Sequence, residues 1–562
     1  MHPSDQPDDS PGRTIAAHSR AFIDPVAPSW SREVAVLVIV GGIAAATRFY
    51  QLSRSGIWFD ESSSCRWIEF SVGELCARTA VDCHPPLYWL LLKGWAMVFG
   101  QSVGALRSMS VLFGVATVWA TYGLVRELQL HWATRIEPNG DRRSTAGLAA
   151  LLVALSPFQI EWSQEMRMYS LGTFLVLTST WLLAIGLRRG GTGVWTAYAV
   201  VGVLLVYTLY FSLFTLLAHG VFAVGRGILS AKWSLGFFSA VAAIGLAWLP
   251  WVPFLWAMYR TVQRSFPQGP LTWAEFSTLF WWMFVPQNAD PSWDLAKSIL
   301  VEACAVLVVL LIASRSSEQV LIALCAFVPI YAIVNLSIVS QNLVARHRLI
   351  LGQIFLLIGW ALVIQRLRST WLRRGVAVVS VAVSCGLALI YLSSRDVKAN
   401  LPGMQAAITS IDQGRSDGEI VLFVNPMLYL NGLVYTTNRV DMFAVGEREQ
   451  YPYYQGSSLT RESDHLAISK IPSTVTSVWV VDADHWFGRS WEVPMPPGWQ
   501  LVAEDRFVEY YADIVVKLYR RTPTVSFSAT ERAFGRPSFG HHLKLQNETS
   551  IATREANLAC HQ

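Results

Sequence analysis

The chain contains eleven apolar segments that are long enough, or nearly long enough, to cross a lipid bilayer as helices. A helix rises about 1.5 Å per residue, so a hydrocarbon core of about 30 Å needs roughly 20 apolar residues. Lipid cannot satisfy free backbone amides, so such segments must be helical. The sequence therefore predicts a polytopic α-helical membrane protein with about 11 transmembrane helices. The predicted spans are Val34–Tyr50, Gly104–Val125, Thr145–Pro157, Met168–Leu187, Val194–Tyr207, Ser212–Val224, Leu235–Ala257, Ser298–Ala313, Val320–Ser340, Leu349–Ile364 and Gly375–Tyr391.

The composition agrees with lipid as the main solvent. Of the 562 residues, 53% are hydrophobic and 15% are charged, and the mean hydropathy is +0.37. A soluble domain usually carries about 25% charged residues. The 24 tryptophans also fit, because Trp collects at membrane interfaces. We expect membrane lipid, and no nucleic acid, as the partner of this surface.

The basic residues of the connecting loops orient the spans. With the N-terminus inside the cell, every inner loop carries Arg or Lys, as the positive-inside rule requires. This alternation holds only if the apolar segment Pro85–Gly100, which contains Lys93, does not span, so we expect a helix that lies at the outer surface or re-enters it. The outer face then carries residues 51–103, Phe158–Arg167, Met258–Lys297 and Gln341–Arg348.

The two ends of the chain differ in composition from its apolar centre. Residues 1–32 are rich in Pro, Asp and Ser and predict a disordered cytoplasmic leader without a cleavable signal peptide. Residues 33–394 form the transmembrane domain. Apolar runs alternate with polar turns over residues 395–521, which predicts an extracytoplasmic α/β domain, and residues 522–562 predict a disordered tail. The expected strands are Glu419–Val424, Val478–Val481 and Ile514–Tyr519.

The first outer loop carries two adjacent carboxylates, Asp60 and Glu61, directly after the apolar run Ile57-Trp58-Phe59. Desolvation just above the membrane raises a carboxyl pKa and a nearby cation lowers it, and either effect can prepare a general base. The alternative is structural. In that case the aromatic residues anchor the loop at the interface and Asp60 caps a helix.

The same loop continues with Asp82, Cys83 and His84 in front of two prolines. A histidine before a rigid Pro-Pro can be held in one orientation at a helix entrance, although such a motif alone is more often a turn. The seven cysteines show no metal-ligand spacing. Because Cys65, Cys76 and Cys83 share this loop, one disulfide among them and three free thiols are both compatible with the sequence.

Two shorter outer loops add charged side chains. Glu165, Arg167 and Tyr169 precede one span, and Arg167 could hold a phosphate through a bidentate contact or could snorkel to the interface beside a glutamate. Arg346 and His347 start a late span on the outer side, against the positive-inside trend. This position favours an anionic head group as their partner, with simple binding of membrane lipid phosphate as the alternative.

These motifs, in this order, resemble the membrane glycosyltransferases of the GT-C fold. The likeness is to the family of protein O-mannosyltransferases, lipid A aminoarabinose transferase and their bacterial relatives, and it covers residues from about 34 to 365. Its specific part is Trp58-Phe59-Asp60-Glu61 together with Asp82-x-His84-Pro85-Pro86. Relatives often carry a histidine where this chain has Leu209, which puts any metal-binding role of that position in doubt. The Arg346-His347 match is also looser than the family's Arg-Tyr.

The resemblance implies an inverting glycosyltransferase that takes a monosaccharide from a polyprenyl-phosphate donor. The acceptor is a hydroxyl group of a protein, a lipid or a cell-envelope glycan outside a bacterial plasma (inner) membrane. Asp60 stands at the position of the family's catalytic acid and would deprotonate this hydroxyl. Glu61 would orient the acceptor or a metal. Mg or Mn is compatible with the sequence, but no ligand set requires a cofactor.

The resemblance also implies roles for the cations. Arg167, Arg346 and His347 would bind the donor phosphate and stabilise it as it leaves. Asp82, His84, Glu165 and Tyr169 would support this site, with His84 shaping it and Glu165 orienting the acceptor or a metal.

Two other classes of protein would share these spans. A membrane transporter or lipid flippase needs ionisable groups near the bilayer midplane and often shows inverted repeats. The spans offer only His219, Glu302 and Asn335 as polar candidates, and no repeat is visible in the sequence. A catalytically inactive scaffold or sensor with the same fold would keep the spans and would tolerate the loss of Asp60.

Overall fold

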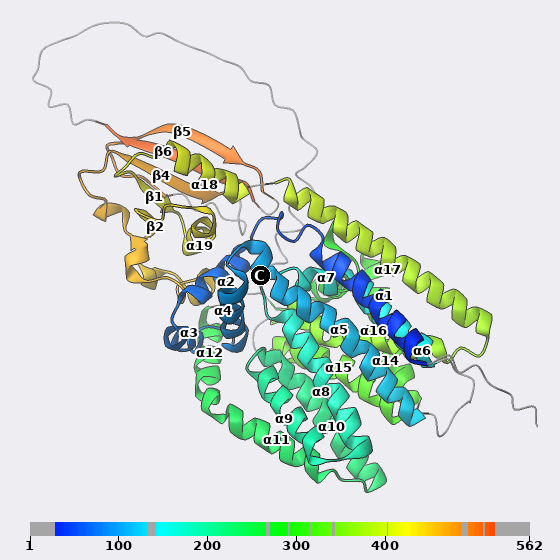
Figure 1. Cartoon of the computed structure of the whole chain (residues 1–562). Helices are drawn as coiled ribbons and strands as arrows, with labels where there is room; N and C mark the ends of the chain where they lie inside the picture. Colours follow the sequence, from blue (N-terminus) through cyan, green and yellow to red (C-terminus); the bar gives the residue numbers. More distant parts are fainter. Residues whose placement is uncertain are drawn as a thin grey trace, which may run out of the picture.

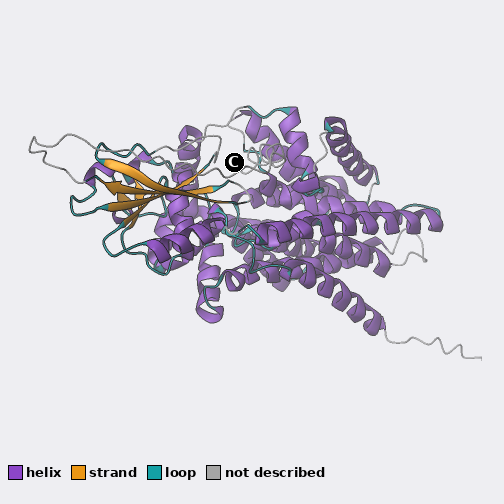
Figure 2. Cartoon of the chain, turned by 90° about the horizontal axis from the view of Figure 1, so that it is seen from above, coloured by secondary structure: helices purple, strands orange, loops and turns teal. Residues whose placement is uncertain are grey.

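The computed structural model describes residues 29–132, 142–265, 270–289, 293–314, 316–339, 343–401, 403–484, 493–509 and 512–522. Within these residues a long helical bundle carries a smaller sheet region at one end (Figures 1 and 2). Most of the predicted leader (residues 1–28) and nearly all of the predicted tail (residues 523–562) lie outside the described residues. The fold class predicted from the sequence, a helical membrane protein with a C-terminal α/β region, is confirmed.

Each of the eleven predicted spans overlaps a helix of the structure. The helices are α1 (Ser29–Phe49), α2 (Phe59–Glu69), α3 (Val72–Thr79), α4 (Leu87–Phe99), α5 (Val103–Trp132), α6 (Arg142–Leu155), α7 (Pro157–Ser163), α8 (Tyr169–Arg189), α9 (Thr192–Val206), α10 (Leu213–Ser230), α11 (Leu235–Trp248), α12 (Val252–Ser265), α13 (Trp273–Trp281), α14 (Asp294–Ala313), α15 (Ser317–Val339), α16 (Ile350–Gln365), α17 (Thr370–Ala399), α18 (Gly403–Gly414) and α19 (Pro426–Tyr435). Short 3-10 helices are η1 (Tyr210–Ser212), η2 (Leu249–Trp251), η3 (Gln287–Ala289), η4 (Arg346–Leu349), η5 (Arg448–Gln450), η6 (Tyr453–Gln455), η7 (Glu462–Asp464) and η8 (Ile468–Lys470).

Not all of these helices are long and apolar enough to cross a membrane by themselves. Among the described residues eight are, and α6 with α7 makes a ninth if this pair, bent by 59°, is one span. The other two predicted spans are α1, with charged residues near both ends, and α9, whose 15 residues rise only about 22 Å. The segment predicted not to span forms α4, an apolar helix of 13 residues.

The bend between α6 and α7 begins the segment that the sequence predicts as the second outer loop. Ser156 caps α7 by accepting a hydrogen bond from the backbone of Gln159, and Pro157 begins the helix. A proline removes a backbone donor, so the carbonyls before it lose their helical partners. The buried guanidinium of Arg48 takes these partners' place and donates to the carbonyls of Val153 and Ala154 at 3.3 and 3.0 Å. The backbone carbonyls at the bend therefore have hydrogen-bond partners inside the bundle.

The C-terminal region holds a six-stranded sheet in the order β3-β2-β1-β4-β6-β5. The strands β3, β2, β1 and β4 run parallel, and β6 and β5 add antiparallel strands at one edge. The central strands β1 and β4 are almost wholly buried, as is usual for parallel strands. The three predicted strands correspond to β1, β4 and β6. The strand bounds are β1 (Ile420–Phe423), β2 (Met442–Val445), β3 (His465–Leu466), β4 (Ser477–Ala483), β5 (Trp499–Phe507) and β6 (Ile514–Arg521).

Helix α19 of the sheet region packs against α2 at the start of the first outer loop (Figure 1). The backbone of Ile57 donates to the Tyr435 hydroxyl at 2.8 Å, and Asn431 donates to the Ile57 carbonyl at 3.1 Å. Both polar groups of one buried loop residue are thereby satisfied by another part of the chain. The sheet region is thus fastened to the segment that carries Asp60.

A buried ion pair between Glu61 and Arg107 fixes the other side of this segment. The guanidinium Nε and Nη2 atoms lie 2.7 and 2.6 Å from the two carboxylate oxygens, and both side chains are 1% exposed. Arg107 also donates to the carbonyls of Leu52, Ser55 and Gly56. This pair holds the entry of the first outer loop onto α5. Glu61 was expected to orient the acceptor or a metal, but both of its oxygens are already engaged.

Removal of one charge from this pair should weaken the fold. We predict that Glu61→Gln lowers the free energy of unfolding by about 3–5 kcal/mol, because it leaves a buried guanidinium uncompensated. Unfolding of the purified protein in detergent, by heat or by SDS, measures this loss. The matched control is Glu447→Gln, which breaks the exposed pair with Lys470 and should cost less than about 1 kcal/mol. Equal small losses in both variants would contradict a structural role of the pair.

Candidate functional site

Four loops of the bundle bring their polar residues together at the end of the bundle that meets the sheet region. They are the start of α2, the turn before α4, the turn between α7 and α8, and η4 before α16. The carboxyl, imidazole and guanidinium groups of these loops influence one another electrostatically. The loops lie close to the sheet region, so the site has two walls of different origin.

Asp60 is the second residue of α2 and remains partly open to solvent. Its side chain is 26% exposed, and its Oδ2 atom lies 3.4 Å from Nη2 of Arg167. The N-cap of α2 is Trp58, which makes no side-chain cap hydrogen bond. The alternative in which Asp60 serves as the helix cap is therefore wrong. Its carboxylate is available to solvent and has one cation beside it.

Arg167 stands behind Asp60 and is almost fully buried, with 4% of its surface exposed. The guanidinium lies over the rings of Trp89 and Tyr169, at 6.0 and 5.9 Å from the ring centroids. Burial would lower its pKa, but Asp60 and then Tyr169 act in the opposite direction, and the pKa of Arg167 is raised. Its Nε atom has no hydrogen-bond partner among the described residues. A permanent charge with an unused donor suits the binding of an anion.

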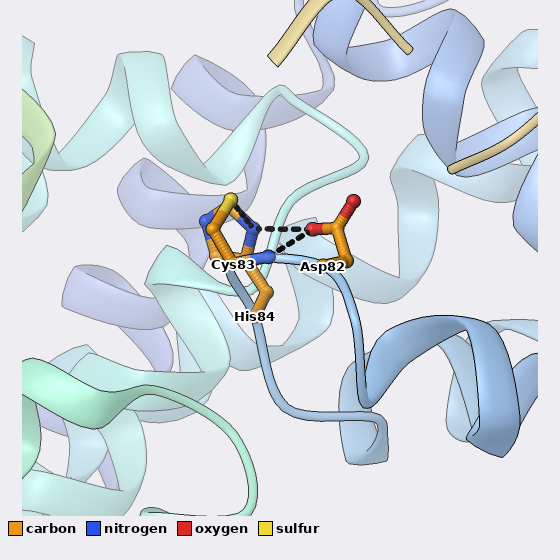
Figure 3. A group of neighbouring side chains, drawn as sticks. All are labelled: Asp82, Cys83 and His84. Carbon is orange, nitrogen blue, oxygen red and sulfur yellow. Dashed lines mark hydrogen bonds and ion pairs between the residues drawn. The ribbon is translucent and has the colours of Figure 1, made fainter. Parts of the chain in front are cut away.

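Asp82, Cys83 and His84 form a tight cluster next to this pair (Figure 3). The Cys83 Sγ atom lies 3.0 Å from Nδ1 of His84, and this Nδ1 lies 3.5 Å from Oδ1 of Asp82. Burial would raise the pKa of Asp82, but contacts with His84, Ser458 and the Cys83 backbone outweigh it, and this pKa is lowered. Burial lowers the pKa of His84. Asp82 is therefore ionised and fixes the histidine ring.

The Arg346-His347-Arg348 cluster divides between two environments. Arg346 is buried and donates to Glu161 at 2.7 Å, so it has an internal partner. The ring of His347 lies against that of Tyr169, with centroids 4.9 Å apart. Arg348 donates to the carbonyl of Leu343 at 2.7 Å, and it also interacts electrostatically with Asp60, Cys83 and Tyr169.

Electrostatic contact with Asp60 makes Arg348 a further candidate residue of the site, whereas the sequence pointed to Arg346. The two arginines belong to η4, and a 3-10 helix has about 3 residues per turn. Residues two apart therefore point in different directions. The same divergence holds in an α-helix, so the sequence alone did not indicate which arginine lies near Asp60.

Glu165 lies at the back of the site. Burial, together with the neighbouring carboxylates of Glu61 and Glu161, raises the pKa of Glu165 to about 8. Its Oε2 atom has no hydrogen-bond partner among the described residues. Near neutral pH this residue is mostly a neutral acid, in contrast to Asp82.

The second wall of the site comes from the sheet region. Ser458 donates to Oδ2 of Asp82 at 2.7 Å, across 376 positions of sequence. Tyr453 interacts electrostatically with Cys83, Arg348 and Asp82. Arg78 of α3 holds this segment by donating to the Ser458 carbonyl at 2.7 Å. Sequence analysis predicted the domain but gave no signal for these contacts.

Gly456 shapes the same segment. It ends η6 with φ of +85°, and a Cβ atom there would meet Leu430 at 3.1 Å and Phe59 at 3.6 Å. Only glycine adopts this left-handed conformation without strain. The segment of residues 453–460 can therefore approach the start of α2 closely, next to Asp60.

The cysteines of the first outer loop are all free in the described structure. Cys65, Cys76 and Cys83 form no disulfide. The sequence allowed either one disulfide or three free thiols, and the structure has three free thiols. Leu209, which stands where relatives carry a histidine, is 3% exposed and belongs to the apolar core. That position offers no metal ligand here.

Comparison with solved structures identifies the fold. ArnT from Cupriavidus metallidurans in the apo state matches at a TM-score of 0.54 and 13% identity, over 86% of this chain and 98% of that chain. Its structure bound to undecaprenyl phosphate matches at 0.55 and 14%, over 87% and 98%. No family model and no curated protein sequence matches the chain. The likeness confirms the GT-C fold expected from the motifs.

The raised pKa of Glu165 predicts a pH dependence of stability. An acid whose pKa is higher in the folded chain stabilises the fold at low pH, and this contribution is lost as pH rises through the folded value of about 8. We predict that Glu165→Gln, which keeps a neutral side chain, has a higher thermal midpoint than the wild type at pH 8.5 and a flatter dependence between pH 5 and pH 9. Glu462→Gln, at an exposed position, is the control. Curves of wild type and Glu165→Gln that run parallel would refute the prediction.

Proposed function

We propose that this protein is an inverting glycosyltransferase that moves a monosaccharide from a polyprenyl-phosphate donor to an acceptor hydroxyl outside the membrane. The observation that supports it most is the pairing of a partly exposed carboxylate, Asp60, with a buried cation, Arg167, at 3.4 Å. The GT-C fold also favours a glycosyltransferase. The residues of the site, and not the fold, determine which chemistry the protein can perform.

Asp60 is the proposed general base. The acceptor oxygen forms a bond to the anomeric carbon, its proton passes to the Asp60 carboxylate, and the bond to the donor phosphate breaks with its electron pair going to phosphate. A single displacement of this kind inverts the anomeric carbon. The exposed fraction of the Asp60 side chain, 26%, leaves room for a hydroxyl to reach it. Glu61 cannot share this role while both its oxygens bind Arg107.

Arg167 and Arg348 are the proposed ligands of the donor phosphate, with His84 and His347 beside them. Both guanidinium groups interact electrostatically with Asp60. They therefore lie close to the base, and we propose that they reach across the reacting carbon to stabilise the charge that develops on the leaving phosphate. Arg346, expected from the sequence to bind phosphate, is instead assigned a supporting role through its pair with Glu161.

A donor anchored by a lipid chain explains the position of the site. The sugar phosphate of such a lipid lies at the membrane surface, and the polar residues gather at one end of an apolar bundle. We propose that this end faces the outside of a plasma membrane, as the basic inner loops indicate. The segment of residues 453–460 would then cover the acceptor, and the acceptor would contact Tyr453 and its neighbours.

The transporter reading gains no support from the polar residues inside the spans. His219 is buried, but its two ring nitrogens contact Thr180 and Tyr198 at 3.0 Å each. Asn335 donates to the carbonyl of Tyr331 in its own helix. Glu302 is exposed on α14. These side chains are satisfied locally or lie on the surface, and they do not converge on a midplane site.

Loss of the base should abolish transfer without unfolding the protein. We predict that Asp60→Asn lowers sugar transfer by about 100-fold or more, the size expected for a general base. The assay supplies labelled polyprenyl-phosphate sugars and native envelope to membranes that contain the protein. Asp417→Asn, an exposed position in the sheet region, is the matched control. Full activity of Asp60→Asn would reject Asp60 as the base and favour the inactive-scaffold reading.

Weakening the contact between α3 and the segment of residues 453–460 should raise the KM for the acceptor more than the KM for the donor. Arg78→Met removes the hydrogen bond that holds the Ser458 carbonyl. We predict a KM for the acceptor raised by about 5-fold or more, as expected for a lost charged hydrogen bond of at least 1 kcal/mol, with the KM for the donor lipid unchanged. Arg415→Met is the control, since Arg415 binds the carbonyls of Asn438 and Val440 elsewhere in the sheet region. A change in the donor KM alone would contradict the assignment of this wall.

A further inference from the structure

The cluster of Asp82, Cys83 and His84 has the composition and spacing of a metal site. Among the described residues it brings one oxygen, one sulfur and one nitrogen ligand atom within 4.8 Å of one another. A zinc ion binds such atoms at about 2.0–2.3 Å, which places neighbouring ligands roughly 3–4 Å apart. The measured separations are 3.0 Å for Cys83 Sγ to His84 Nδ1 and 3.5 Å for His84 Nδ1 to Asp82 Oδ1. All three side chains point toward one place (Figure 3).

We propose that these three side chains bind a divalent zinc ion. Thiolate and imidazole ligands favour zinc, whereas Mg and Mn prefer sites made of oxygen atoms. The Mg or Mn compatible with the sequence therefore fits this cluster less well than zinc does. Three protein ligands leave the fourth tetrahedral position open, as in catalytic rather than structural zinc sites.

The surroundings of the cluster are consistent with this site. Oδ2 of Asp82 accepts a hydrogen bond from Ser458 at 2.7 Å, which leaves Oδ1 directed at His84. Such outer contacts orient metal ligands and raise their affinity. Ser458 belongs to the sheet region, so a metal at this site would depend on both walls.

The two arginines near the cluster require that the ligands neutralise the charge of the metal. Arg167 and Arg348 both interact with Cys83 and would repel a bare cation. A zinc ion bound by one carboxylate and one thiolate is neutral overall, which removes this repulsion. The open fourth position would then accept water or an anionic oxygen attracted by the two guanidinium groups. If the proposed function holds, that oxygen would belong to the donor phosphate. The metal site itself does not depend on the proposed function.

Cobalt gives a direct test, because Co²⁺ replaces Zn²⁺ and a thiolate–cobalt bond produces a charge-transfer band in the near ultraviolet. The purified full chain, stripped with a chelator, is titrated with Co²⁺ and then with Zn²⁺. We expect a saturable band with one Co²⁺ per chain, and its displacement by Zn²⁺. Absence of this band from the folded wild-type protein would overturn the proposal, whatever the variants do.

Variants locate the ligands. Cys83→Ser should abolish the band, while Cys76→Ser and Cys65→Ser, at free thiols of the same loop, should keep it. His84→Asn should weaken Co²⁺ binding by about tenfold or more, at least the loss seen for outer-shell residues of metal sites. A band that persists in Cys83→Ser would overturn the assignment. Since the readout is metal binding, a failed sugar-transfer assay would leave this result intact, and the reverse also holds.

Discussion

The buried pair of Glu61 and Arg107 is the contact on which the site depends. Arg107 uses its donors on one carboxylate and on the carbonyls of Leu52, Ser55 and Gly56, and Glu61 also accepts the backbone N–H of Met166 at 3.0 Å. One ion pair thus fixes the first outer loop, α5 and the turn before α8. Because Asp60 and Arg167 each lie next to a residue of this network, their mutual position follows from it.

The two neighbours Asp60 and Glu61 show how adjacent carboxylates acquire different environments. Glu61 is 1% exposed and paired on both oxygens, whereas Asp60 is 26% exposed and has a single cation 3.4 Å away. Successive helix residues point about 100° apart, so one faces the bundle and the other faces the opening. The buried acid provides the rigidity that a positioned base needs.

The sheet region is part of the site and not an appendage. Its contacts reach Ile57 on one side of Asp60 and Asp82 on the other. They include the close approach of Gly456 to Phe59. If the proposed function holds, a wall supplied by a separate unit would allow the acceptor surface to change while the residues proposed to bind the donor phosphate stay in place.

Much of this arrangement could be predicted from the sequence, and the reasons are local. Apolar length placed a helix at each predicted span, eight or nine of which are long and apolar enough to cross a membrane among the described residues, and alternation located β1, β4 and β6. The motifs around Asp60, His84 and Arg167 pointed to residues that the fold brings together.

The parts that sequence reasoning missed depend on long-range or directional geometry. The partner of Glu61 lies 46 residues away, and that of Asp82 lies 376 residues away. The choice between Arg346 and Arg348 depends on which side of η4 lies toward Asp60. The proposed metal site of Asp82, Cys83 and His84 was not expected, because ligands at successive positions match no familiar metal spacing.

The claim that this site receives a lipid phosphate is tested most directly by binding. Native mass spectrometry of the purified protein would compare undecaprenyl phosphate with undecaprenol, which has the same chain and no phosphate. The account predicts that the wild type prefers the phosphate by about tenfold or more, or about 1.4 kcal/mol, and that Arg167→Met together with Arg348→Met removes this preference. Equal binding of the two lipids by the wild type would contradict it.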